Sequence, residues 1–458
     1  MNSKGKILSV FTLMMINVIA VDSLRTLPIS AEYGSALIFY YVVAAICFFI
    51  PTVLVTAELA TAWPNTGGAY VWVTKAFGPK IGFLTIWLQW IYNVVWYPTI
   101  LAFLAGTLAS LIDPALASST TYTLSIILIL FWASTILSCM GLQISSRFSV
   151  IGAVVGTMIP ILIIISLGML WIAHGHVSQV HFDRADLIPK LDNLNNLGFL
   201  VAVLFGLVGM EMSAVHAGDV KNPQKDYPRA LLYSSLIILV TLIGGSLAIA
   251  VVIPPSQISL VSSLIDAYAI FFKAHHWVWA VPAMVAMIFI SGLANMSAWV
   301  IGPTRGLWVA AEEGNVPAYF AKLNKHGMPA RILVLQAIIV TLLCTVFLLM
   351  SSVNSSYWIL TALTSQLALL FYIFMFAAVI RLRYKSPEVV RAYRIPGGNW
   401  GVWVVAGVGI LTSIGVILLG FLPPSNLQIA SVRTYELILV GGILVFSLPP
   451  LLIHRNKK

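Results

Sequence analysis

The sequence alternates long apolar runs with short polar connections over its whole length. A helix needs about 20 mainly apolar residues to cross a bilayer, and runs of this kind recur from end to end. The longest connection covers about residues 174–195, so no gap leaves room for a soluble domain. We predict an all-α membrane protein with twelve transmembrane helices over the runs 7–31, 35–61, 81–111, 121–141, 148–173, 196–217, 229–252, 276–302, 330–350, 356–382, 399–421 and 433–453.

The first apolar run contains polar residues and a helix breaker. It carries Asp22, Ser23, Arg25 and Pro28 within seven positions. Proline lacks an N–H group and disfavours helix in the residue before it, so the helix should open near 22–27. Asp22 and Arg25 are three positions apart, and they either contact a substrate or neutralise each other.

The sixth run contains a second cluster of this kind. Gly206 and Gly209 weaken the helix just before Glu211, so a second break is expected near 206–212. Non-helical backbone at membrane depth is tolerated only where protein or a water-filled cavity surrounds it. Glu211 should therefore line a substrate or proton cavity, and Ser23, Gly206 and Gly209 are further substrate candidates at the two breaks. The alternative is a structural carboxylate that bonds to its own broken backbone.

The two interrupted runs are five helices apart. This spacing is typical of a 5+5 inverted repeat of the leucine-transporter kind, in which broken helices face each other at the membrane midplane. We therefore expect one transmembrane permease domain over 1–458. Its first repeat covers 1–173, its second covers 195–383, and two further helices cover 399–454.

Composition and charge agree with a membrane protein and fix its expected orientation. Of the 458 residues, 60% are hydrophobic and only 9% are charged, against about 25% charged in soluble domains. With a cytoplasmic N-terminus, 20 of the 25 Lys and Arg fall on cytoplasmic segments, as the positive-inside rule requires. We expect a multi-pass protein of the cell membrane, the inner membrane in a bacterium, with both termini cytoplasmic. The net charge of +10 then reflects topology, and no nucleic-acid partner is expected.

Four connecting segments resemble those of the amino acid–polyamine–organocation permeases. The resemblance implies a secondary transporter that moves an amino acid by alternating access, with a proton or a sodium ion as the candidate coupling ion. The matching segments are "ELATAWPNTGGAYVWVTKAFGPKIGFL" (58–84), "KNPQKDYPRAL" (221–231), "GPTRGLWVAAEEGNVPAYF" (302–320) and "RLRYKSPEVVRAYRIPGG" (381–398).

Within this superfamily, "GMEMSAVHAGDVKNPQKDYP" is similar to the sixth-helix motif of the glutamate:GABA antiporter group. The resemblance places that motif's Glu and His at Glu211 and His216, which become candidates for proton coupling. The chain departs from the group at Ser149, where the group has a lysine, and at Asn295, where it has a glutamate. It also has "VDSLRTLP" in place of the superfamily's glycine-rich first break.

Arg25 is the strongest hydrogen-bond donor in this unusual first break. A guanidinium offers two parallel donors to a carboxylate, which would replace the backbone amides of a glycine-rich break. The alternative is that Arg25 extends to the outer membrane surface. On helix three, Asn93 and Trp96 are further substrate candidates, although such aromatic residues more often pack in the core. Ser291 and Asn295 share a face of helix eight, where they would contact substrate or a sodium ion.

Acidic residues near the cytoplasmic helix ends are candidates for a gate. Glu58 and Glu312 should form gate or loop salt bridges with Lys75, Arg147 or Arg305.

Three functions remain open at this point: an amino acid transporter, a polyamine or amine exchanger, and a receptor or scaffold that keeps the fold without flux. No Walker motif and no catalytic constellation is visible, and the three cysteines are single residues within spans. We therefore expect no enzyme activity, no cofactor and no bound metal. The sequence does not determine the oligomeric state.

Overall fold

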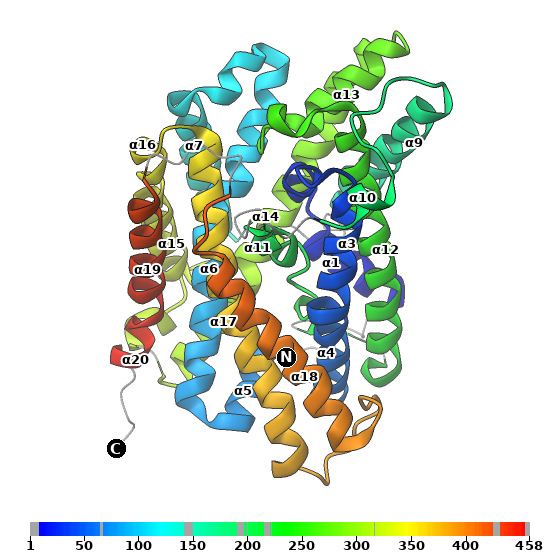
Figure 1. Cartoon of the computed structure of the whole chain (residues 1–458). Coiled ribbons are helices and arrows are strands. Elements are labelled where there is room, and N and C mark those ends of the chain that lie inside the picture. Colours follow the sequence, from blue (N-terminus) through cyan, green and yellow to red (C-terminus); the bar gives the residue numbers. More distant parts are fainter. Residues whose placement is uncertain are drawn as a thin grey trace.

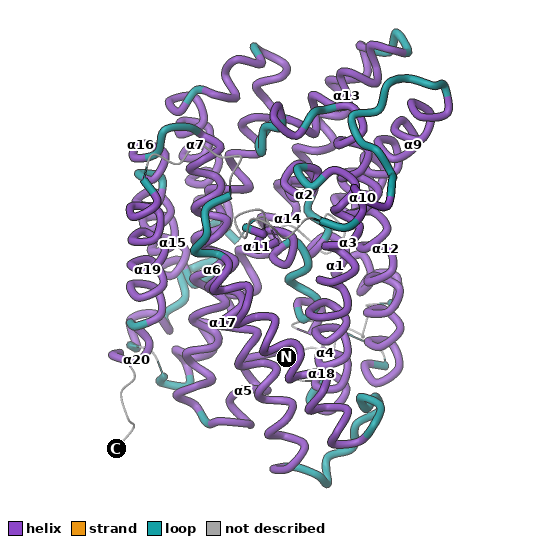
Figure 2. The backbone as a smooth tube through the Cα atoms, viewed as in Figure 1, coloured by secondary structure: helices purple, strands orange, loops and turns teal. Residues whose placement is uncertain are grey.

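The chain folds into a bundle of helices joined by short connections (Figures 1 and 2). The computed structural model describes residues 9–64, 67–141, 150–189, 197–198, 200–214, 220, 222–315, 317–424 and 431–453. Its elements are α1 (Val10–Val21), η1 (Leu24–Thr26), α2 (Leu27–Ala31), η2 (Gly34–Ala36), α3 (Leu37–Ala44), η3 (Ala45–Phe49), α4 (Ile50–Ala62), α5 (Ala69–Phe77), α6 (Pro79–Ile112), η4 (Pro114–Ser118), α7 (Thr120–Cys139), η5 (Gly152–Met158), α9 (Ile159–Ala173), α10 (Arg184–Leu187), α11 (Leu200–Phe205), α12 (Pro223–Val252), η8 (Pro255–Gln257), α13 (Ser263–Ala274), η9 (Val278–Ala280), α14 (Val281–Glu312), η10 (Ala318–Ala321), α15 (Ala330–Leu343), α16 (Val346–Leu349), α17 (Val353–Lys385), α18 (Gly398–Leu419), α19 (Val432–Ser447) and α20 (Pro449–Ile453).

Eleven helices in the described part of the chain are long and apolar enough to cross a membrane. They correspond to eleven of the twelve predicted runs. In the described residues of the remaining run, 196–217, the six-residue α11 is followed by turns and irregular backbone and then by a 3₁₀ turn at 212–214, so they form no continuous spanning helix. The all-α membrane fold is confirmed, and the difference in number lies at the run for which a break was predicted.

The first predicted break is confirmed between α1 and α2. Asp22 and Ser23 lack helical structure, and the next three residues form the tight 3₁₀ turn η1. The expected role of Pro28 was wrong in detail. Leu27, the residue before it, has helical backbone angles, and Pro28 lies in the first turn of α2, where a missing N–H costs no helical hydrogen bond.

The second predicted break is confirmed after α11. Residues 206–211 form turns and irregular backbone, and Gly209 has a φ of +124°, a value that side-chain-bearing residues rarely adopt. The two breaks also meet in space. A Cβ atom placed on Gly209 would lie 3.2 Å from Val21 Cγ2 and 3.4 Å from the carbonyl oxygen of Ala20, at the end of α1. One placed on Gly206 would lie 3.6 Å from Thr26 Cβ.

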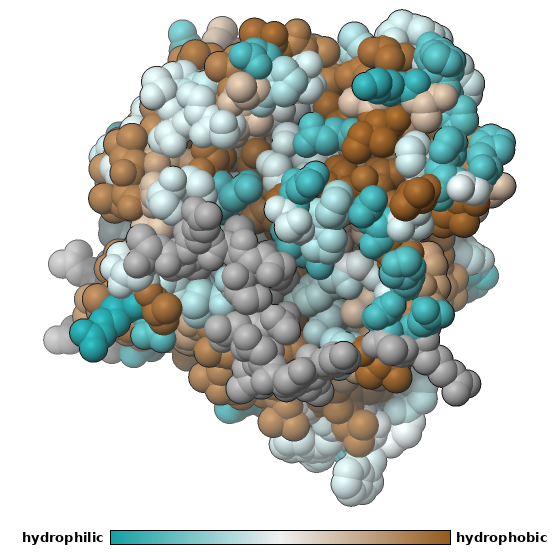
Figure 3. All heavy atoms as spheres, turned by 45° about the horizontal axis from the view of Figure 1, so that its top comes forward, coloured by the Kyte–Doolittle hydropathy of each residue, from teal (hydrophilic) through white to brown (hydrophobic). Residues whose placement is uncertain are grey.

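The broken helices are enclosed by long helices. In Figure 1, α11 lies in the middle of the bundle, close to the labels of α14 and α6, and α17 runs beside α6. Most of α6 and α17 is buried, whereas α7, α18 and α19 expose many large apolar side chains. Broad hydrophobic areas reach the surface in Figure 3. This pattern fits a protein whose outer helices face lipid.

The close approach of the two breaks predicts a large effect of a methyl group at Gly209. An alanine there would place its Cβ 2.9 Å from Trp299 Cζ2 and would keep a strained φ. We expect Gly209→Ala to lower the free energy of unfolding by about 1–3 kcal/mol. Gly407→Ala on α18 is the control, because its Cβ would meet no atom within 4 Å. Equal thermal unfolding of the two purified variants in detergent would contradict the prediction.

Candidate functional site

A small cavity lies where the two breaks meet α6 and α14. The volume of the cavity is about 20 Å³, which is enough for about one water molecule. An amino acid does not fit this space unless the breaks move. The lining residues are Ala20, Val21, Ser23, Arg25, Thr26, Tyr92, Asn93, Trp96, Phe205, Gly206, Val208, Asn295 and Trp299.

Arg25 supplies the only charged side chain among these lining residues. It is 1% exposed, so the alternative placement at the outer surface is wrong. Its Nη1 donates to the hydroxyl of Tyr357 on α17 at 3.0 Å, and that hydroxyl also lies 3.2 Å from the carbonyl oxygen of Arg25. Its Nε has no hydrogen-bond partner. The guanidinium is therefore bonded through Nη1, and its Nε remains free to donate to a ligand.

Aromatic rings surround the Arg25 guanidinium. Its central carbon lies 5.6 Å from the ring centroid of Trp96 and 5.2 Å from that of Phe205. Such contacts stabilise a cation by up to about 2 kcal/mol when water is excluded. Trp299 packs edge-on against both Trp96 and Tyr92. The aromatic residues of α6 thus form part of the cavity wall, and Trp96 takes the position that the sequence predicted.

Polar side chains of α14 bond to the carbonyl oxygens at the end of α1. Asn295 Nδ2 donates to the carbonyl of Ile19, and Trp299 Nε1 donates to that of Ala20 at 3.1 Å. These carbonyls lie at a helix end, where they lack intrahelical partners. Asn295 Oδ1 stays unbonded and buried. Asn93 donates to the Gln89 carbonyl within its own helix at 2.6 Å.

Asp22 lies outside the cavity lining, although its neighbours Val21 and Ser23 belong to it. Its Oδ2 lies 2.7 Å from Thr241 Oγ1 on α12. The ion pairs among the described residues do not include one between Asp22 and Arg25. The expected neutralisation of these two residues by each other is therefore absent, because their side chains leave the break in different directions.

Glu211 is 2% exposed and lies at the end of the second break, but it does not line the cavity. The Tyr372 hydroxyl donates to Glu211 Oε2 at 2.5 Å and accepts from the Gly209 N–H at 2.9 Å. Gln89 Nε2 lies 3.5 Å from the other carboxylate oxygen. Glu211 is thus bonded to the broken backbone through Tyr372, as the structural alternative for this residue expects.

The remaining coupling candidates lie apart from the cavity. Ser291 shares a 2.6 Å hydrogen bond with Thr157 of η5 and does not line the cavity. His216 and Ser149 fall outside the described residues. Coupling through Glu211, His216 or Ser291 stays a prediction.

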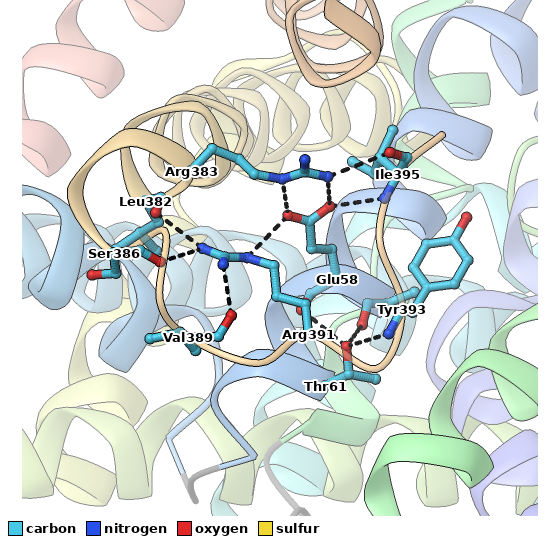
Figure 4. A network of polar contacts seen from close by, with 10 residues as sticks. Glu58, Thr61, Leu382, Arg383, Ser386, Val389, Arg391, Tyr393 and Ile395 are labelled. Atoms are coloured by element: carbon cyan, nitrogen blue, oxygen red, sulfur yellow. Dashed lines mark hydrogen bonds and ion pairs between the residues drawn. The ribbon is translucent and has the colours of Figure 1, made fainter. Parts of the chain in front are cut away.

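Glu58 forms a buried ion cluster with partners other than the expected Lys75 and Arg305, and the third expected partner, Arg147, lies outside the described residues. Arg383 donates to it from Nε at 2.5 Å and from Nη2 at 2.7 Å, and Arg391 Nε lies 3.3 Å away (Figure 4). The N–H of Ile395 donates to it at 2.9 Å. The backbone carbonyl of Lys75 instead accepts a hydrogen bond from the Lys385 ammonium group. The spacing of residues in the sequence could not predict this cluster, because α17 and the loop after it are about 300 residues away from α4 in the chain.

The other gate candidates lie on α14. Arg305 and Glu312 are exposed, and neither is a partner in the two ion pairs of Glu58. Glu313, next in the chain, accepts a short hydrogen bond from Tyr70 of α5. The end of α14 therefore contacts α5 through Glu313, and not through the predicted Glu312.

Comparisons with known proteins agree with this architecture. The model of the amino acid permease family matches residues 7–444. The chain is 54% identical over 456 residues to an uncharacterised transporter of Legionella pneumophila, covering 100% of this chain and 98% of that protein. It is 29% identical over 461 residues to a glutamate/gamma-aminobutyrate antiporter of Lactococcus lactis, covering 99% and 91%. It is 25% identical over 429 residues to a probable agmatine/putrescine antiporter of that species, covering 93% and 90%.

The chain therefore belongs to the amino acid permease family. It is a multi-pass membrane protein and a secondary transporter. The predicted relation to amino acid–polyamine–organocation permeases, near the glutamate:GABA antiporters, is confirmed. Its substrate class at this level is an amino acid or an amine.

The Glu58 cluster predicts a strong loss of stability when its carboxylate is neutralised. Glu58→Gln would leave the buried guanidiniums of Arg383 and Arg391 close together without a counter-charge. Removal of one partner from a buried ion pair typically costs about 3–5 kcal/mol. Glu388→Gln, an exposed change in the same loop, is the control. Thermal unfolding in detergent measures both, and a Glu58→Gln protein as stable as the control would contradict the prediction.

Proposed function

We propose that the chain carries amino acids across the cytoplasmic membrane by alternating access, and that Arg25 binds the substrate carboxylate. The observation that carries this proposal is the charge of the cavity. Its lining contains one cation and no carboxylate. A buried guanidinium with an unbonded Nε is a strong donor for an anion, and the surrounding low dielectric strengthens the attraction.

The same charge argues against amines as the preferred substrate. Agmatine and putrescine, which one relative is named for, are cations and would be repelled by Arg25. Glutamate and γ-aminobutyrate, which another relative is named for, each contain a carboxylate. The cavity therefore favours carboxylate-containing substrates, and the amine alternative is the less supported of the two.

Transport requires the cavity to enlarge. At about 20 Å³ it is far smaller than the usual ligand site of some hundreds of Å³. The two breaks are the natural hinges, since their backbone lacks the regular ladder of a helix. Movement of α1 and α11 relative to α14 and α17 would open one side of the cavity at a time.

The proposal places the protein in a bacterial inner membrane with both termini in the cytoplasm. Support comes from the 20-to-5 distribution of Lys and Arg. In Figure 1 the connection between α17 and α18, rich in arginine, lies at the lower end, and α13 lies at the upper end.

Cysteine labelling tests this orientation. Val177, which is 78% exposed, lies in a connection assigned to the outside. In a chain without its three native cysteines, Val177→Cys should react with a membrane-impermeant maleimide added outside intact cells. A cysteine at Glu388, in the opposite set of connections, should react only after the membrane is opened. The reverse pattern would refute the orientation.

Substrate selectivity tests the role of Arg25. Purified protein in liposomes is first screened with radiolabelled amino acids, with and without counter-substrate inside. We expect Arg25→Lys to weaken binding of a transported amino acid, because an ammonium cannot reproduce the two-donor geometry. Arg25→Ala should weaken it further, by about ten- to a hundredfold, the value of a charge-assisted hydrogen bond of about 1.5–3 kcal/mol.

The matched control compares each amino acid with its decarboxylated amine. For an amino acid with an uncharged side chain, the amine has no carboxylate, so neither substitution should weaken its binding. Arg433→Ala, an exposed arginine on α19, should leave both affinities unchanged. Equal losses for acid and amine would mean that Arg25 shapes the cavity and does not bind the carboxylate.

A further inference from the structure

Asp22 is a buried carboxyl group without a counter-ion in the part of the chain that the structure describes. Its side chain is 1% exposed, and its Oδ1 has no hydrogen-bond partner. The two ion pairs found among the described residues both belong to Glu58. An ionised carboxylate in this environment would cost several kcal/mol more than a neutral one.

The elements packed against Asp22 offer hydroxyl groups and no cation. Residues 230–252 of α12 contain no charged side chain, and this helix contributes Thr241 beside Asp22. On α3 the titratable group within electrostatic range is Tyr41, whose hydroxyl bonds with Ser30 at 2.9 Å. α1 has no charged residue.

The charged residues nearest in sequence have other surroundings. Arg25 extends toward Tyr357 and the cavity. Glu32 follows α2 as its C-cap, at the far end of that helix. Glu58 on α4, which also packs against α12, is paired with arginines. No described element therefore supplies Asp22 with a compensating charge.

The hydroxyl of Thr241 is the hydrogen-bond donor that Asp22 has among the described residues. Thr241 Oγ1 lies 2.7 Å from Asp22 Oδ2, 2.7 Å from the Ile237 carbonyl and 3.1 Å from the Ile238 carbonyl. A hydroxyl has one hydrogen to donate, and a threonine within a helix commonly donates to the carbonyl four residues earlier. Asp22 Oδ2 therefore shares one donor with two backbone carbonyls and Oδ1 has none, so the neutral, protonated form of this buried carboxyl group is favoured.

Glu211 has more hydrogen-bond donors than Asp22. The Tyr372 hydroxyl donates its one hydrogen to Glu211 and accepts the N–H of Gly209 on its oxygen. Both donors, the Gly209 N–H and the Tyr372 hydroxyl, therefore have an acceptor. Gln89 adds a donor on the other oxygen. The two buried carboxyls of the breaks therefore differ: Glu211 has a donor on each oxygen, whereas Asp22 has one shared donor on Oδ2 and none on Oδ1.

We propose that Asp22 binds a proton when the transporter closes, at a site behind the substrate cavity, and that this proton sets the pH dependence of transport. The inference rests on the proposed transport function. Opening of the first break gives Asp22 access to water, where it ionises, and closing requires Oδ1 or Oδ2 to take up one proton. Closing is thus favoured at low pH and becomes less favourable as pH rises, because the closed state binds one proton more than the open state.

A proton fits the site better than a metal cation does. Sodium would need several oxygen ligands around one point, but Thr241 is the one hydrogen-bond partner of the Asp22 carboxyl group among the described residues. The closed state leaves Asp22 with one unpartnered oxygen, Oδ1. One proton neutralises the group without any further ligand.

The test is the pH dependence of exchange in liposomes, measured with the radiolabelled amino acid that the screen selects, from about pH 5 to 8 on both sides. The α-carboxylate of the substrate stays ionised over this range, and an amino acid with an uncharged side chain adds no further titrating carboxyl group. Wild-type exchange should fall by up to about tenfold per pH unit above its midpoint, as one proton requires. Asp22→Asn, which cannot ionise, should exchange at a rate that varies less than about twofold. Asp22→Glu should restore a pH-dependent rate.

Two further variants separate the possible sources of the effect. Asp266→Asn changes a carboxyl on α13, which bonds with Ser262 outside both breaks, and should keep the wild-type profile. Glu211→Gln should keep the wild-type slope, whatever its rate. Thermal unfolding in detergent checks that each variant is folded.

The outcomes distinguish this inference from the proposed function. A wild type that exchanges no amino acid refutes the transport proposal itself and, with it, the role of the proton. A wild type that exchanges with a flat profile, an Asp22→Asn profile that still falls with pH, or a flat profile in Glu211→Gln alone overturns the inference. So does a slope that appears only in the presence of sodium.

Discussion

The structure depends on satisfying the backbone groups that two broken helices expose inside an apolar bundle. A helix end leaves carbonyl and N–H groups without partners, and lipid offers none. Asn295 and Trp299 bond to the last carbonyls of α1, and Tyr372 bonds to the N–H of Gly209. These side chains come from α14 and α17, so the two unbroken helices hold the broken ones in place and thereby define the cavity.

α17 links the functional parts of the molecule. Its Tyr357 bonds to Arg25 in the cavity, its Tyr372 bonds to Glu211, and its Arg383 bonds to Glu58 in the buried ion cluster. A movement of the breaks relative to α17 would therefore change the hydrogen bonds at both breaks. The ion cluster attaches the C-terminal part of α17 to α4 and to the loop after α17. α17 therefore stays in place when the breaks move.

The charged groups of the breaks have three different environments. Arg25 faces the cavity with an unbonded nitrogen, Glu211 is surrounded by donors, and Asp22 has a single hydroxyl contact. These environments suit Arg25 to binding an anion, Glu211 to fixing a broken helix and Asp22 to exchanging a proton. Substrate and proton would then act on the same short segment from opposite sides, which gives a physical basis for coupling.

The membrane fold, the positions of both breaks and the family could be predicted from the sequence alone, because apolar length, helix breakers and linear motifs are local properties. Six predicted substrate residues also line the cavity: Ser23, Arg25, Asn93, Trp96, Gly206 and Asn295. Three others lie outside its lining: Asp22, Gly209 and Glu211. The partners of the predicted residues emerged only from the folded chain: Arg25 with Tyr357, Asp22 with Thr241, and Glu58 with Arg383. These contacts join residues more than 200 positions apart, and side-chain direction at a break follows from packing that no local pattern encodes.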